Sequence, residues 1–419
     1  MAVMTIESYQ RYTDLARKIE SGGAGDLTPE EETLVQQLRH GSFVHESDRE
    51  ETDELHFRHN MTRYDRSVLN LSIAPTMACN MACRYCYEAE KKGLMSDDVV
   101  DKTIQFVEKQ AVGLRQLTLA WFGGEPLLAM SIIERIGRAF VDIARDRKLA
   151  FSSMIITNGY LLTKKALDTL CELGVQSAQI TLDGPASIHD VKRPLKNGGK
   201  SFQTIVDNLV YASDRISISV RVNVDKGTAA ADLGQLLTEL DQAGLREKIG
   251  LNFGQVEPLT SACADIAESC YNLAEFSKVE AAFFRLLSER GFLVARLPMP
   301  APIACMSQHV NSYLVDPQGR MYKCFAQLGD PSKSMGHIGD AIDYENANFS
   351  TLFDFDAYLD KECRACSLLP VCNGGCPEKR THPGVAKEEL CCSWKYNLQP
   401  MIDIIAHSRL HQDGTIKGK

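Results

Sequence analysis

Three closely spaced cysteines are the residues of this sequence best suited to chemistry. Cys79, Cys83 and Cys86 lie in the stretch APTMACNMACRYCYE, with the spacing Cys-x3-Cys-x2-Cys. Three thiolates at this spacing can hold one metal centre, either zinc or an iron–sulfur cluster. A structural zinc site normally has four protein ligands, so a site with three leaves one coordination position open for water or substrate. The spacing therefore predicts a reactive metal centre.

A second set of cysteines follows in the last third of the chain. The run Cys363-x2-Cys366-x5-Cys372-x3-Cys376 is by itself compatible with a zinc knuckle. The other cysteines of this set are Cys305, Cys324, Cys391 and Cys392. The chain has 14 cysteines, and its N-terminus lacks the basic flank and apolar run of a signal peptide. Because disulfides do not persist in a reducing compartment, we expect a cytoplasmic protein that uses these thiols for metal binding.

Predicted strands that alternate with predicted helices would position the first cysteines. Strands are expected at residues 68–74, 116–122, 151–157, 176–182, 216–224 and 248–254. Helices are expected between them at residues 97–110, 130–146, 164–173, 202–212 and 230–243. Such strands pair in parallel, and no Gly-rich dinucleotide fingerprint follows the first one. The pattern predicts an α/β fold, a partial (β/α)6 TIM-like barrel with functional groups at the carboxyl ends of its strands.

Composition and pattern divide the chain into five segments. Residues 1–66 are a small, mostly helical N-terminal segment, with a helix at 29–39 that Thr28 and Glu31 cap, followed by the charged stretch HESDREETDEL, expected to be a linker. The other predicted segments are the barrel at 67–255, a bridging helical region at 256–298, a Cys-rich domain at 299–396, and a C-terminal helix and tail at 397–419.

The first cysteines and the strand ends together resemble the radical S-adenosylmethionine (SAM) enzymes. Tyr85 is the aromatic residue before the third cysteine, and Trp121-Phe-Gly-Gly-Glu-Pro126 follows the second strand. Thr157-Asn-Gly159 and Thr181-Leu-Asp-Gly184 end the next two strands, and Arg221 lies on the fifth. The resemblance implies that the first three cysteines hold a 4Fe–4S cluster with one open iron. Reduction of this cluster would cleave SAM to a 5′-deoxyadenosyl radical, which abstracts hydrogen from a substrate.

The same resemblance implies a set of SAM contacts. Glycines allow close approach of the backbone to the methionine ammonium, and an arginine offers a fixed fork to its carboxylate. Glu125 would either accept from the ammonium or stabilise its own turn. The implied contacts are Gly123, Gly124, Glu125, Thr157, Asn158, Thr181 and Arg221. Asp183, His189 and Arg193, on the loop after the fourth strand, are candidate catalytic or substrate-binding residues, and His189 is equally suited to a structural hydrogen bond.

The second set of cysteines resembles the SPASM extension of radical SAM enzymes, so the likeness covers about residues 68–394. It implies two auxiliary 4Fe–4S clusters, making three in all. The distal cluster would take Cys363, Cys366, Cys372 and either Cys391 or Cys392. The cluster nearer the barrel would take Cys305, Cys324 and Cys376. Unless Cys263 or Cys270 completes it, one iron there is open and could bind a substrate thiolate.

The resemblance predicts a maturase that modifies a ribosomally made precursor peptide. Hydrogen abstraction from a peptide residue would lead to a thioether or carbon–carbon cross-link. The sulfatase-maturating branch, which makes formylglycine, normally has an Asp directly after the second SPASM cysteine, where this chain has Phe325. Formylglycine formation is therefore the alternative, and a non-catalytic metal-binding interaction protein is the rival from another class. Residues 1–66 could bind a leader peptide or cap the barrel.

Charge and hydropathy exclude other partners. The net charge of −9 opposes binding to nucleic acid or an anionic membrane, and no run of 18 apolar residues occurs. The expected partners are the precursor peptide and, by resemblance, an electron donor such as flavodoxin or ferredoxin.

Overall fold

The computed structural model describes residues 6–22, 25–41, 51–88, 93–258, 260–303 and 305–412. Contacts divide the chain into two compact units, Met1–Leu55 and His56–Lys419. The predicted barrel and the Cys-rich segment therefore belong to one unit. Among the described helices, none combines the length and apolar character needed to cross a membrane.

Residues 6–41 of the N-terminal unit, as far as the structure describes them, form two helices. These are α1 (Ile6–Glu20) and α2 (Pro29–His40), with Leu15 and Val35 buried. The predicted capping box is confirmed, because the Thr28 hydroxyl accepts from the Glu31 amide and the Glu31 carboxylate accepts from the Thr28 amide. Glu31 also forms an ion pair with Lys18 at 2.7 Å. The capping box and ion pairs such as this one thus stabilise the two helices.

The predicted linker is partly wrong. Residues 45–50 lie outside the described residues, but a third helix, α3 (Glu51–Arg63), begins at Glu51. Its acidic first turn holds Glu51, Asp53 and Glu54, which a helix N-terminus stabilises through its dipole. Charge that reads as a solvated linker therefore favours a helix start at this position.

The six predicted parallel strands are confirmed. They are β1 (Val68–Ile73), β2 (Gln116–Trp121), β3 (Ala150–Thr157), β4 (Val175–Thr181), β5 (Ser217–Val224) and β6 (Ile249–Gln255). They lie side by side in the order β6-β5-β4-β3-β2-β1. The helices between them are α4 (Asp97–Gln110), α5 (Met130–Arg147), α6 (Lys164–Glu172), α7 (Ala186–Lys192), α8 (Phe202–Ala212) and α9 (Ala230–Gln242). A short helix, η2 (Pro126–Ala129), also precedes α5. This is the partial (β/α)6 barrel.

Alternation along the strands separates a core face from an inner face. Leu117, Leu119 and Trp121 of β2 are buried in the main core, whereas the residues between them are partly exposed. The same alternation in β5 buries Val220 and Val222. Because successive strand side chains point to opposite faces, Arg221 and other residues of the second set face the inside of the barrel.

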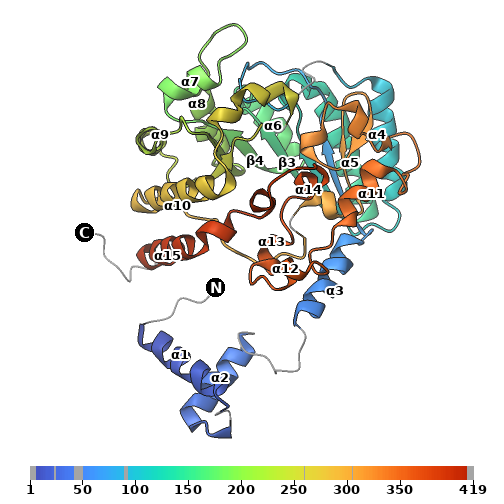
Figure 1. Ribbon diagram of the computed structural model, residues 1–419. Helices are drawn as coiled ribbons and strands as arrows, with labels where there is room; N and C mark the ends of the chain where they lie inside the picture. Colours follow the sequence, from blue (N-terminus) through green and yellow to red (C-terminus); the bar gives the residue numbers. More distant parts are fainter. Residues whose placement is uncertain are drawn as a thin grey trace. The chain divides into compact units, whose positions relative to one another are not determined.

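The Cys-rich segment extends the barrel sheet. Strand β7 (Ser312–Val315) pairs in parallel with β1, and β8 (Arg320–Tyr322) and β9 (Gly336–His337) follow it antiparallel, giving nine strands. The helices here are α11 (Ala347–Asp354), α12 (Lys361–Arg364), α13 (Leu369–Cys372) and α14 (Pro377–Thr381). Short 3-10 turns are η4 (Met306–Gln308), η5 (Phe325–Gln327), η6 (Pro331–Lys333) and η7 (Lys387–Leu390). The long helices α10 (Leu273–Glu289) and α15 (Trp394–Gln412) pack against each other (Figure 1).

Candidate active site

The first cysteine group, Cys79, Cys83 and Cys86, lies in the loop after β1. Burial raises the pKa of the Cys79 thiol, and the neighbouring Glu125 and Cys83 add to the effect. The Met81 amide donates to Cys79 Sγ at 3.4 Å. The loop therefore folds around the Cys79 sulfur, with a second thiol of the group close by.

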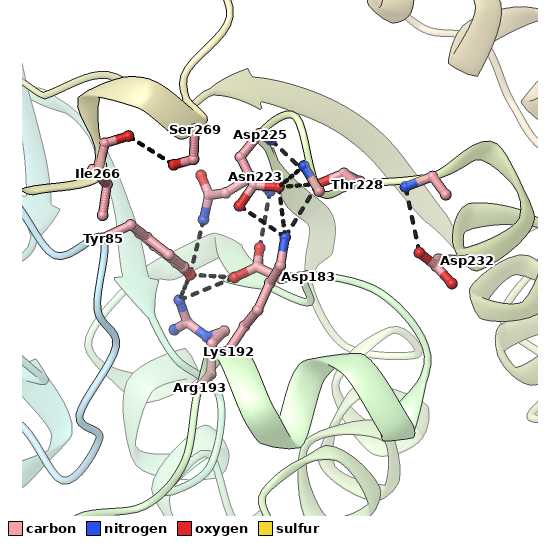
Figure 2. Close-up of polar contacts among 12 residues, drawn as sticks. Tyr85, Asp183, Lys192, Arg193, Asn223, Asp225, Thr228, Asp232, Ile266 and Ser269 are labelled. Carbon is pink, nitrogen blue, oxygen red and sulfur yellow. Dashed lines mark hydrogen bonds and ion pairs between the residues drawn. The ribbon is translucent and has the colours of Figure 1, made fainter.

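The Tyr85 hydroxyl fixes this loop to the carboxyl ends of the strands (Figure 2). It donates to Asp183 Oδ2, and it accepts from Arg193 Nη1 and, at 3.2 Å, from Asn223 Nδ2. Asp183 Oδ1 also accepts from the Asn223 amide at 2.9 Å. Burial raises the pKa of Tyr85 well above its usual value, so the hydroxyl stays protonated. Asp183 and Arg193, two predicted catalytic candidates, thus hold the cysteine loop in place.

His189, the third candidate, lies on α7 and supports Asp183. Its Nδ1 accepts from the Asp183 amide at 3.2 Å, and its fully buried ring meets Phe202 edge to face. Burial and the nearby Arg193 lower its pKa to about 3. At neutral pH the imidazole is therefore uncharged, as its hydrogen bond from the amide requires.

The glycines after β2 pack directly against the cysteine loop. A Cβ on Gly123 would stand 2.4 Å from the Thr76 carbonyl oxygen, and one on Gly124 would stand 2.4 Å from that of Ala78. Gly123 also has a φ of 113°, in the region that favours glycine. Only glycine allows the two loops to come this close.

Glu125 links this turn to the end of β3. Its Oε1 accepts from the Leu127 amide at 3.1 Å and from Thr157 Oγ1 at 2.7 Å, and its Oε2 accepts from the Asn158 amide at 2.8 Å. Asn158 Nδ2 in turn donates to Asn80 Oδ1 at 2.7 Å. Of the two roles considered for Glu125, the geometry favours stabilisation of the turn, because both carboxylate oxygens already have protein donors.

Arg221 lies on the inner face of β5. In register it pairs with Thr181 at the end of β4, and its Nε donates to Asn223 Oδ1 at 2.8 Å. Its positive charge acts to lower the pKa of the Tyr87 hydroxyl, and Tyr87 directly follows the cysteine group. The guanidinium passes over Gly254 of β6, where a Cβ would stand 2.1 Å from Nη2. Arg221 thus reaches the neighbourhood of the cysteine loop, as an arginine that binds a SAM carboxylate must.

Two buried donors support the fit of a cluster and SAM at this place. Among the described residues, Asn80 Nδ2 and Arg193 Nε have no hydrogen-bond partner although both are buried. Asn80 adjoins Cys79, and the charge of Cys83 acts on Arg193. Buried donors without acceptors are costly, so acceptors that a bound group brings would satisfy them. The residues present fit the predicted group.

A second group lies next to the barrel, and we call it the proximal group: Cys305, Cys324 and Cys376. Burial raises the pKa of the Cys324 thiol, and Glu378, Cys305 and Cys376 add to the effect. The charge of Cys324 also raises the pKa of the Tyr87 hydroxyl, and Tyr87 directly follows Cys86. The proximal group therefore lies near the first cysteine group.

Gln327 and Glu378 join two segments of the proximal group. Gln327 Oε1 accepts from the Cys324 amide at 3.2 Å, and its Nε2 donates to Glu378 Oε2 at 2.7 Å. Cys376 lies just before Glu378 in the chain. No motif in the sequence indicated this link.

The distal group contains the remaining cysteines of the second set: Cys363, Cys366, Cys372, Cys391 and Cys392. A hydrogen bond from the Cys392 thiol lowers the pKa of Cys372. The charges of Cys372 and Cys366 both raise the pKa of the Cys391 thiol. Lys395 Nζ lies 4.0 Å from Cys366 Sγ. The sorting of the cysteines into two auxiliary clusters stays a prediction.

No three His, Cys, Asp or Glu side chains of the described chain are arranged to hold a single metal ion.

The thiols of Cys263 and Cys270 form hydrogen bonds with nearby backbone carbonyls. The buried Cys263 thiol donates to the carbonyl oxygens of Glu257 and Thr260, and the Cys270 thiol donates to that of Ile266. The 3-10 segment η3 (Ser261–Ser269) is kinked at Cys263 and ends just before Cys270, so the two cysteines do not lie on one regular helix.

Sequence reasoning also missed Asn223, Gly254 and the Tyr85 hydroxyl as site residues. Asn223 could have been found, because it lies two positions after Arg221 and so shares its face of the strand. Lys192 also lies close to these residues, where it forms an ion pair with Asp225 at 2.9 Å (Figure 2). This ion pair could not have been predicted from the sequence, because it depends on the placement of α7.

Comparisons with known proteins show which proteins this chain resembles. The radical SAM superfamily profile matches residues 73–240. The serine-type anaerobic sulfatase-maturating enzyme of Klebsiella aerogenes is 27% identical, over 82% of this chain and 86% of that protein. The sporulation killing factor maturation protein SkfB of Bacillus subtilis is 24% identical, over 39% of this chain and 38% of that one.

Two solved structures share the fold. The enzyme anSMEcpe with bound AdoMet has a TM-score of 0.60 and 18% identity, over 81% of this chain and 99% of that chain. Streptococcus suis SuiB bound to its precursor peptide SuiA has a TM-score of 0.56 and 13% identity, over 90% and 87%. The chain therefore contains a radical SAM domain at residues 73–240, and over most of its length it is similar to an enzyme named as a sulfatase-maturating enzyme.

Proposed function

We propose that this protein is a peptide maturase that abstracts hydrogen from a residue of a ribosomally made precursor and forms a thioether or carbon–carbon cross-link. One observation carries the choice among maturases. The residue after Cys324 is Phe325, and its ring packs edge to face on Phe122 with centroids 4.7 Å apart. A phenyl ring there cannot accept the proton that formylglycine formation releases.

The chain's own residues hold the reacting groups. In this proposal Cys79, Cys83 and Cys86 hold a 4Fe–4S cluster, and Arg221 holds the SAM carboxylate. When bound, the cluster and SAM supply a 5′-deoxyadenosyl radical. In the same proposal the backbone carbonyls of Gly123 and Gly124 would receive the methionine ammonium, and Tyr85 keeps the loop fixed. An electron donor such as flavodoxin or ferredoxin belongs to the same proposal.

Thioether formation is the leading outcome, since the proximal group offers three cysteines. In the described structure the thiols of Cys263 and Cys270 donate to backbone carbonyls instead. A fourth ligand to a proximal cluster could then be a thiolate of the peptide, held beside the carbon radical. A variant with Cys263→Ala and Cys270→Ala should keep the auxiliary-cluster spectrum, and loss of that spectrum would contradict the open iron.

Formylglycine formation on a sulfatase is the second candidate. Matches to enzymes named as sulfatase-maturating over 82% and 72% of this chain favour it. Each of these matches spans at least four-fifths of the other protein as well.

One experiment separates the candidates. Anaerobically reconstituted protein with dithionite and SAM should yield 5′-deoxyadenosine, and a non-catalytic metal protein would yield none. Mass spectrometry of a precursor peptide encoded beside the gene should then show loss of two hydrogens. Conversion of a sulfatase peptide to formylglycine, without change in the precursor, would replace the first candidate with the second.

A further inference from the structure

Asn80, directly after Cys79 in the first cysteine loop, carries a buried hydrogen-bond donor. Its side-chain nitrogen Nδ2 is buried and has no hydrogen-bond partner among the described residues. A buried donor without an acceptor is costly, because it has given up its hydrogen bond to water. The loop therefore presents a donor for which the described part of the chain supplies no acceptor.

Asn158, directly after β3, determines which end of the Asn80 amide is left over. The Tyr160 backbone amide donates to Asn158 Oδ1 at 2.9 Å, so the other end of the Asn158 side chain is its nitrogen. This nitrogen donates to Asn80 Oδ1 at 2.7 Å. Because a backbone N–H can only donate, turning over either side-chain amide would break this chain of hydrogen bonds. Asn80 Oδ1 is therefore held by Asn158, and Nδ2 is the end without a partner.

The backbone around Asn80 is held as well. The Lys196 amide donates to the Asn80 carbonyl oxygen at 2.8 Å, and the Ala82 amide donates to the Pro194 carbonyl oxygen at 2.9 Å. Lys196 and Pro194 both belong to the segment that follows α7. With its backbone and its side-chain oxygen both fixed, Asn80 cannot turn Nδ2 toward another acceptor without losing the hydrogen bond from Asn158.

The Asn80 amide lies beside the sulfur of Cys79. Cys79 Sγ is 3.9 Å from Asn80 Oδ1 and 3.9 Å from Asn158 Nδ2. A cluster on Cys79 would bring sulfur acceptors to this place, and hydrogen bonds to the sulfurs help to set the reduction potential of such a cluster. The SAM carboxylate is assigned to Arg221 on β5, whereas the side-chain contacts of Asn80 are to Cys79 and the end of β3. A cluster sulfur is therefore the acceptor that these contacts favour.

We infer that the Asn80 side-chain amide donates a hydrogen bond to a sulfur of the SAM-binding cluster and raises its reduction potential, with Asn158 as the positioning residue. The inference rests on the proposed function. The one electron that dithionite or a protein donor adds makes the cluster more negative. A hydrogen-bond donor then stabilises the reduced form more than the oxidised form. Without this donor the cluster should be harder to reduce.

A redox titration followed by EPR, on anaerobically reconstituted full-length protein, tests this. The SAM-binding cluster is identified as the one whose signal changes when SAM is added. Asn80→Ala should lower the reduction potential of this cluster, measured without SAM. Asn70→Ala is the matched control, because Asn70 Nδ2 on β1 donates to Ser312 Oγ at 2.9 Å, and it should titrate like the parent. An unchanged potential in Asn80→Ala overturns the inference.

SAM affinity distinguishes a cluster sulfur from SAM as the acceptor. If the amide donated to SAM, Asn80→Ala would bind SAM about tenfold more weakly and the potential without SAM would stay as in the parent, which overturns the inference. Asn80→Asp keeps an oxygen for Asn158 Nδ2 and replaces only the donor, so it should also lower the potential.

A measurement on the parent protein does not depend on how well these variants fold. Pulsed EPR of the reduced protein, with nitrogen-15 in its asparagine side chains, should show a nitrogen coupling to the SAM-binding cluster that is reduced in Asn80→Asp. A parent without this coupling overturns the inference. A preparation in which no signal responds to SAM contradicts the proposed function itself, so the two failures can be told apart.

Discussion

The guanidinium of Arg221 on β5 lies over Gly254 on β6, so closely that a Cβ at position 254 would stand 2.1 Å from its Nη2. The two strands are neighbours, with Asn223 and Gly254 in register. A missing side chain on one strand thus gives an arginine on the next its path toward the cysteine loop.

Gly254→Ala should therefore displace Arg221. We expect the affinity for SAM to fall about tenfold, or about 1.4 kcal/mol, as measured by anaerobic calorimetry. Gly250→Ala is the matched control, because it lies on the same strand and its Cβ would find its nearest neighbour 3.9 Å away. Equal SAM affinity in both variants would show that Arg221 does not contact SAM.

Tyr85→Phe removes the shared hydroxyl of the loop. Asp183 and Arg193 would then each lose a charge-assisted hydrogen bond in a buried place. The free energy of unfolding should fall by about 1.5–3 kcal/mol in urea titrations, and iron content should fall with it. Tyr160→Phe, outside this network, should change stability by about 0.5 kcal/mol or less. Full iron content in Tyr85→Phe would argue against a loop-fixing role.

Glu125→Gln replaces one acceptor oxygen with a donor. The side chain would then present an NH2 group to Thr157 or to the Asn158 amide, both of which donate. We expect a loss of about 1–3 kcal/mol of unfolding free energy, seen as a lower urea midpoint. Glu134→Gln, at a half-exposed ion pair with Arg138, should cost about 0.5 kcal/mol at most. Similar midpoints for the two variants would contradict the linking role of Glu125.

His189 should make the protein less stable in acid. Its folded-state pKa of about 3 lies below the ordinary value of 6.5, so between these pH values only the unfolded chain binds the proton. The contribution of neutral His189 is fully present above pH 6.5 and is lost as pH falls toward 3, by about 1.4 kcal/mol per pH unit. Urea unfolding at pH 6.5, 5.5 and 4.5 should show a smaller decline for His189→Gln than for the parent. Parallel declines would contradict the shift.

The last ligand of the distal group can be identified by paired variants. Cys391 interacts with both Cys366 and Cys372, whereas Cys392 donates to Cys372 and packs against the main core. We predict that Cys391→Ala loses one auxiliary cluster, measured by iron content and absorbance near the charge-transfer band. Cys392→Ala should keep all clusters and lose stability instead, and the reverse pattern would assign the ligand to Cys392.

Local patterns in the amino-acid chain were enough to predict the strands and to recognise the cysteine motifs. Alternating apolar runs predict the six parallel strands correctly, because burial on one face imposes a period that is local in the chain. Cysteine spacing is also local, so the three cysteines after β1 and the run from Cys363 to Cys376 can be recognised from the amino-acid chain alone.

How distant residues come to share a place depends on the fold. Tyr85, Asp183 and Arg193 meet across about a hundred residues, which no local period encodes. The start of α3 at Glu51 was mispredicted as linker, because the acidic residues that suggest a solvated segment also stabilise a helix N-terminus. Parallel strands bring their carboxyl ends to one edge, but which side chains touch there depends on packing between elements that lie far apart along the chain.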